Sequence, residues 1–123
     1  MALRLEKGVL TSPGATGNQT VSLIDIGFGQ VKALMVWGSY HTAEADTDGN
    51  AIFCQGIGTY RGSVVQQAVV SLFSADAGAS SDTARGHQTN QILRGYSAAT
   101  PTVDFTASLV SLGDAQFVLN WTD

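Results

Sequence analysis

Short apolar runs alternate with short polar breaks along the whole chain. The breaks contain glycine or one of Ser, Thr, Asn and Asp, and the runs are rich in Val, Ile, Phe, Tyr, Trp and Thr. β-Branched and aromatic residues suit the pleated surface of a sheet, whereas glycine and small polar residues favour turns. The pattern predicts strands at residues 19–24, 30–38, 51–60, 63–73, 90–96, 103–111 and 115–122, with a short edge piece around residues 3–7.

The alternation is clearest near the C-terminus. In the last run, Phe117, Leu119 and Trp121 fall on one face and polar residues fall on the other. The run before it alternates in the same way. A period of two is typical of a strand that is buried on one side. Residues 111–114, between the two runs, predict a hairpin turn.

Two other runs have a less regular pattern. Residues 31–37 are apolar on both faces apart from Lys32, which predicts a central strand covered on both sides. Residues 63–73 contain some apolar positions at helical spacing, so a helix is the alternative there. Because β-branched residues dominate this run, we predict a strand.

These elements predict a single all-β domain over residues 1–123. The fold class is an antiparallel β-sandwich, jelly-roll-like, with about seven to eight strands. A chain of 123 residues is long enough to bury a core without disulfides or metals. Residues 1–10 are expected to form an edge strand or an attachment segment. The aromatic residues assigned to the core are Phe28, Trp37, Phe53, Phe105, Phe117 and Trp121.

Composition narrows the classes of function. Hydrophobic residues make up 44% of the chain and charged residues only 13%, which argues against disorder and leaves a largely neutral surface. The net charge is −4 and the basic residues are scattered singly, so we expect no nucleic-acid partner. No apolar run approaches ~20 residues and the first ten residues lack a signal-peptide pattern, so we expect no transmembrane helix and no signal peptide.

Two segments predict long loops, at residues 39–50 and 75–88. Long loops in a small domain are frequent binding sites. Tyrosines at strand ends beside such loops, together with loop histidines and an arginine, could contact a ligand. The ligand-binding candidates are therefore Tyr40, His41, Tyr60, Arg85 and His87.

The acidic loop also contains a weak metal-binding candidate. Asp46 and Asp48 are spaced like the first ligands of a calcium loop, but the downstream Glu that completes such a loop is missing. We therefore expect a solvated turn, and no metal and no cofactor. Neither histidine has the spacing of a zinc ligand.

Catalytic chemistry has one candidate nucleophile. Cys54 is the single cysteine and lies within an apolar strand, where cysteines are usually inert packing residues. We therefore expect no enzyme activity. Gly56 and Gly58 lie in the same strand with no helix after them, which favours a bulge or a close approach of strands over a phosphate loop.

Four segments, in order along the chain, resemble small domains of tailed-bacteriophage structural proteins. They are TGNQTVSLIDIGFGQVKALMVWGS (residues 16–39), FCQGIGTYRG (53–62), SSDTARGHQTNQIL (80–93) and DAQFVLNWT (114–122). This chain departs from the family pattern at Gly29-Gln30-Val31, where an aromatic residue and a proline are expected. It departs again at Ala115-Gln116, which replaces a turn glycine.

The resemblance implies a β-sandwich located in the virion, in a head fibre, a decoration protein or a tail fibre. The implied partners are other virion structural proteins of the capsid or tail, and the implied state is a homo-oligomer. The alternative is a carbohydrate-binding module that recognises host surface glycans. No catalytic residue is carried over, because the matching positions are core and turn residues.

Overall fold

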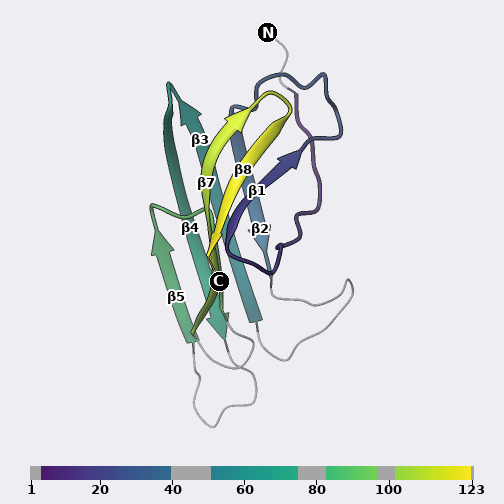
Figure 1. Ribbon diagram of the computed structural model, residues 1–123. Helices are drawn as coiled ribbons and strands as arrows, with labels where there is room; N and C mark the ends of the chain where they lie inside the picture. Colours follow the sequence, from purple (N-terminus) through teal and green to yellow (C-terminus); the bar gives the residue numbers. More distant parts are fainter. Residues whose placement is uncertain (1–3, 40–50, 75–82, 97–101, 123) are drawn as a thin grey trace.

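The protein is an antiparallel β-sandwich of eight strands in two sheets (Figure 1). The computed structural model describes residues 4–39, 51–74, 83–96 and 102–122. This confirms the predicted fold class. The strands are β1 (Gly17–Ser22), β2 (Ala33–Gly38), β3 (Ala51–Arg61), β4 (Val64–Ser74), β5 (Thr83–Gln88), β6 (Leu93–Tyr96), β7 (Val103–Gly113) and β8 (Gln116–Thr122). In the described part of the chain, no helix is long and apolar enough to cross a membrane.

One sheet has the order β1-β8-β7-β6 and the other the order β2-β3-β4-β5. The chain crosses between the sheets after β1 and again after β5. The remaining connections join antiparallel neighbours within one sheet. The first and last strands are adjacent, as in a jelly roll, but the two Greek keys of that topology are absent. The expected jelly-roll-like connectivity is therefore replaced by two meanders.

The two turn residues determine how the strands of the longest hairpin, β3 and β4, are connected. Arg61 pairs with Val64, which leaves a two-residue loop of Gly62 and Ser63, with φ angles of +56° and +76°. Two successive residues at positive φ make the type I′ turn that matches the twist of paired strands. The prediction of a strand over a helix for residues 63–73 is confirmed.

Three local predictions are wrong. Residues 83–88 form the edge strand β5, although their small and polar residues favour a loop. Residues 4–7 form no strand. The β7–β8 turn consists of Asp114 and Ala115, because β7 continues to Gly113 and contributes the buried Leu112 to the core.

The core lies between the two sheets and contains the alternating residues of β8. Phe117, Leu119 and Trp121 are all buried, as predicted. The indole N–H of Trp121 donates to the side-chain oxygen of Gln19 at 2.9 Å, so the ring is buried without leaving a donor unpaired. Phe105 packs against this indole at a centroid distance of 5.8 Å. Phe105 and Phe28 are partly buried against the core, in agreement with their assignment.

The sheets approach one another most closely at two glycines of β3. A Cβ at Gly56 would overlap the carbonyl oxygen of Ile92, and a Cβ at Gly58 would lie 2.6 Å from a methyl carbon of Leu109. Both glycines keep a regular register with β4, so there is no bulge here. Of the two alternatives expected for this glycine pair, a bulge or a close approach of strands, the structure has the close approach, which joins β3 to the opposite sheet.

A side chain from the other sheet accepts a backbone hydrogen bond at a bulge in β7. The β7–β8 register shifts between Leu109 and Ser111, which interrupts the ladder. The backbone N–H of Leu109 instead donates to the side-chain oxygen of Gln67 at 2.7 Å. Because the shift changes which residues face inward, Leu109 and Leu112 are both buried.

The first crossover, residues 23–32, wraps around the tip of the β7–β8 hairpin. The backbone N–H groups of Leu23 and Val31 donate to the carbonyl oxygens of Ala115 and Gly113, at 2.8 and 2.9 Å. The N–H of Ala115 donates in turn to the carbonyl of Gly29 at 2.8 Å. The crossover is therefore fixed to the hairpin by main-chain hydrogen bonds.

Two aromatic residues assigned to the core are not in it, so those predictions are wrong. Trp37 is 61% exposed and Phe53 is also exposed. Residues 31–37 likewise do not form a central strand, because β2 is an edge strand. Alternation within a strand identifies two faces, and here the face with Trp37 and Phe53 points away from the second sheet.

Gly56→Ala is expected to destabilise the fold by about 3 kcal/mol or more, because the new methyl group collides with backbone that cannot move aside. Gly8→Ala is the matched control, since a Cβ at Gly8 meets nothing within 4 Å. Urea unfolding of both variants measures the difference. Equal midpoints for Gly56→Ala and the wild type would contradict the close approach.

The two tryptophans are expected to respond differently to truncation. Trp121→Ala should cost ~3–5 kcal/mol, because it empties a buried site. Trp37→Ala should change the free energy of unfolding by less than about 1 kcal/mol. Thermal unfolding at low protein concentration, where copies of the chain stay apart, provides the measurement. A larger loss for Trp37→Ala than for Trp121→Ala would reverse the assignment of faces.

Candidate functional site

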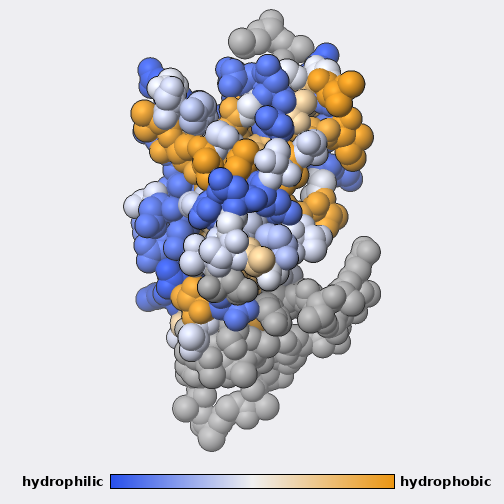
Figure 2. Space-filling view, viewed as in Figure 1, coloured by the Kyte–Doolittle hydropathy of each residue, from blue (hydrophilic) through white to orange (hydrophobic). Residues whose placement is uncertain are grey.

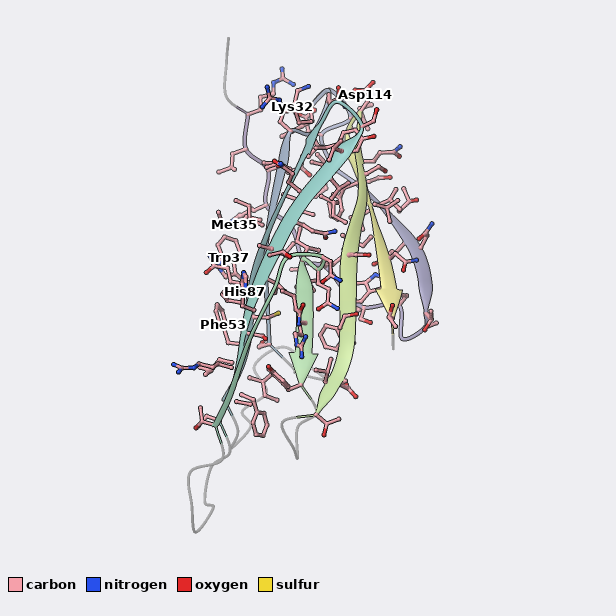
Figure 3. The ribbon with its side chains drawn as sticks, turned by 90° about the vertical axis from the view of Figure 1, so that its left-hand side faces the viewer. Lys32, Met35, Trp37, Phe53, His87 and Asp114 are labelled. Carbon is pink, nitrogen blue, oxygen red and sulfur yellow. The ribbon has the colours of Figure 1, made fainter. Side chains whose placement is uncertain are left out.

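The outer side of the β2-β3-β4-β5 sheet is an exposed apolar surface, called here the apolar face. Figure 3 shows Met35, Trp37 and Phe53 projecting from this sheet, away from the second sheet. The large apolar side chains of the face are between 39% and 61% exposed. They are Met35, Trp37, Phe53, Ile57, Val70 and Leu72.

The strand register makes these residues neighbours. Met35 pairs with Ile57, and Phe53 pairs with Leu72. Trp37 and Val70 lie on either side of Gln55 in one row across the sheet. Because directly paired side chains lie about 5 Å apart on the same face, the six residues form one continuous patch.

The opposite outer surface of the sandwich has a different character. The outward side of the β1-β8-β7-β6 sheet has polar residues such as Asn18, Thr20 and Asn120, and the Asn120 amide donates to Asn18 at 2.7 Å. Figure 2 shows this surface largely in blue and white over β1, β7 and β8. The apolar face lies on the far side in that view. Only one of the two sheets is therefore apolar on both sides.

The size of the apolar face is at the upper end of what an isolated chain exposes. At the observed exposures its six large side chains present roughly 500–600 Å² of surface, using ordinary side-chain areas. A typical monomer has a largest apolar patch of about 300–600 Å², and such patches are often functional. The face is therefore the strongest candidate for a binding surface in the described part of the chain.

Arg85 and His87 border the apolar face at β5. Arg85 pairs with Leu72 and His87 pairs with Val70, and both side chains are exposed. Together with Phe53 they line a shallow hollow of about 450 Å³. The one polar residue in the middle of the face is Gln55, which is half-buried between its neighbours.

A second group of exposed apolar residues lies near the crossover. Leu5, Val9, Ile24 and Ile26 are between 87% and 97% exposed. Orange residues at the upper right of Figure 2 mark this region. Leu5 and Ile24 line one open hollow together with Phe28, and exposed apolar residues that adjoin one another often mark a contact surface.

The N-terminal segment is attached to the crossover by its polar residues. The Glu6 carboxylate accepts from the backbone N–H groups of Ile24 and Asp25, at 2.7 and 3.1 Å. Arg4 donates to the carbonyl of Gly27 and forms an ion pair with Asp25 at 3.6 Å. These bonds hold the backbone of the segment against the crossover, while the apolar side chains of Leu5, Ile24 and Ile26 stay exposed.

The candidate ligand residues do not form one cluster. Tyr40 and His41 lie outside the described residues, as do the metal candidates Asp46 and Asp48. Tyr60 is partly buried against the core and is not a surface platform. Arg85 and His87 are the candidates that the fold brings together, at the edge of the apolar face.

The candidate nucleophile is separated from the described histidine. Cys54 is 2% exposed and faces the core, whereas His87 is on the outer side of the same sheet. Burial raises the pKa of the Cys54 thiol, partly offset by hydrogen bonds from the backbone of Arg94 and Gly38. A thiol of this kind is a poor nucleophile. In the described ranges, no three His, Cys, Asp or Glu side chains come together as metal ligands.

Sequence reasoning missed the apolar face, although a signal was present. Residues 31–37 are apolar at both odd and even positions, and parts of β4 share this property. This pattern predicts a strand covered on both sides. It does not say whether the second cover comes from the same chain or from another molecule.

Comparison of the chain with family models, with curated proteins and with solved structures found no match.

Cys54 is expected to resist thiol reagents in the folded protein. At pH 8, reaction with a disulfide reagent should be at least ~100-fold slower than in denaturant, because the folded site excludes the reagent and the raised pKa lowers the thiolate fraction. The absorbance of the released thiol measures both rates. Rapid reaction of the folded protein would show that Cys54 is accessible.

Proposed function

We propose that this chain is an accessory structural subunit of a tailed-phage particle. It is displayed on the capsid or tail surface and works by burying its apolar face against other protein subunits of the particle. The observation that carries the proposal is the uncovered patch of Met35, Trp37, Phe53, Ile57, Val70 and Leu72. Leaving such a surface in water is unfavourable by roughly 25 cal/mol per Å², so a protein partner stabilises it.

The chemistry of the face favours a protein over a glycan. Interface centres are poor in charged residues and rich in aromatic residues and Met, as this face is. Sugars need several polar groups that converge on their hydroxyls, and the middle of the face offers only Gln55. An exposed Trp37 could stack on a sugar ring, so binding of host surface glycans is the alternative function.

Two further observations support a subunit of an assembly. The exposed apolar residues of the N-terminal segment offer a second contact region, separate from the apolar face. The resemblance of four chain segments to phage structural domains favours a virion, which is built from repeated copies of its subunits, as the assembly. The low content of charged residues lowers the desolvation cost of both contacts.

Particles that lack this chain are expected to be less stable to heat, or to lose an external feature in electron micrographs. Adding back the wild-type protein should restore both. Ile57→Lys places a charge in the middle of the apolar face and should reduce incorporation at least tenfold, because burying an unpaired charge is costly. Thr20→Lys, on the polar side of the other sheet, is the matched control and should incorporate normally.

Other outcomes separate the alternatives. If particles without the chain keep their stability but adsorb poorly to host cells, glycan binding is the function. If the chain is absent from purified particles, or if Ile57→Lys incorporates like the wild type, the proposed role of the apolar face is wrong.

A further inference from the structure

We infer that the partner covering the apolar face is a second copy of this chain, in a face-to-face dimer. The two-fold axis lies in the interface along the row Trp37–Gln55–Val70–His87. This inference rests on the proposed function of the face as a protein contact, and it adds the identity and orientation of the partner.

The area of the face suits such a pair. Its six large apolar side chains present about 500–600 Å², and the surrounding polar side chains of the sheet extend it toward the ~800 Å² per partner of a stable interface. The face belongs to a regular four-stranded sheet, and two sheets of this kind stack well at about 10 Å.

Gln55 decides between the possible orientations. It lies in the middle of an otherwise apolar surface, and no hydrogen bond joins its amide to another described side chain. A primary amide has both donors and acceptors, so two Gln55 amides that face each other across a two-fold axis satisfy one another. An axis parallel to the strands and midway between β3 and β4, the two central strands of the sheet, would instead place each amide against Val70 of the other copy, which leaves it unpaired.

The same axis places a small side chain opposite a large one at one position, and it places the two Trp37 side chains opposite each other. The two-fold rotation about this row places each residue on one side of the row opposite a residue on the other side of the row in the second copy. Ile57 then faces the second copy's position 53, a phenylalanine, and the small Ala68 faces its position 72, a leucine. A small side chain opposite a large one allows two sheets to interdigitate.

At the β5 end of the axis row the two His87 side chains face each other, and the Arg85 side chains lie further along the border. Arg85 lies two residues along β5 from the axis row, so the two Arg85 side chains in the dimer start about 13 Å apart along the strands. They lie at the rim, where solvent screens them. The described residues of the face include no acidic side chain, so no carboxylate is buried when the copies meet.

Sedimentation of the purified chain tests the pairing. The wild type is expected to be a dimer at micromolar concentration. Gln55→Glu places two carboxylates opposite each other and should weaken the dimer at least tenfold, whereas Gln55→Leu should keep it. Thr20→Lys is the control and should sediment like the wild type. Circular dichroism checks that each variant keeps its strands.

Cross-linking tests the orientation. Val70→Cys lies on the axis, so a short bismaleimide that spans ~10 Å should join two copies. Leu72→Cys lies off the axis, and its two thiols should be too far apart. The buried Cys54 of the wild type provides the background. Cross-linking of both variants would mean an axis parallel to the strands and would overturn the inferred geometry.

A separate outcome would overturn only the identity of the partner. If the wild type sediments as a monomer at high concentration while Ile57→Lys still fails to enter particles, the face binds a different protein. In that case the inferred dimer is wrong and the proposed function stands. If Ile57→Lys also enters particles normally, both are wrong.

Discussion

The contact between Gly56 of β3 and the backbone of Ile92 is the constraint on which the sandwich depends. Ile92 lies where the chain crosses from β5 to β6, and its N–H donates to Ala107 in the opposite sheet. Its carbonyl rests on Gly56, where no side chain fits between the two backbones. This contact fixes the separation of the sheets, and larger side chains such as Leu109 and Trp121 fill the space on either side of it.

Once this interior is closed, the sandwich has no room for the remaining apolar residues of β2, β3 and β4. Alternation along each strand sends every second residue outward, and on these strands the outward residues include Trp37, Phe53 and Ile57. The other sheet carries mostly polar residues at the equivalent positions, with Val110 of β7 as an exposed exception. In one chain, therefore, three of the four sheet surfaces are buried or mostly polar, and the fourth, the apolar face, stays exposed to solvent.

The fold places the elements of the proposed contact on rigid supports. The apolar face lies on a four-stranded sheet, and β3 and β4 at its centre are joined by a tight type I′ turn. The crossover is bonded to the β7–β8 tip, and Glu6 holds the N-terminal segment against that crossover. Rigid surfaces lose little entropy on association, which suits a subunit that packs in repeated copies.

The sequence by itself determined the fold class, the strand identity of residues 63–73 and the buried face of β8, because each depends on local alternation, β-branched residues and turn chemistry. It also indicated Gly56 and Gly58 as a point of close approach. It could not place β2 at an edge, pair β5 with β4, or separate Trp37 from Trp121. Those outcomes depend on which sheet faces which, and hydrophobic alternation is the same whether an apolar side is covered by its own chain or by another.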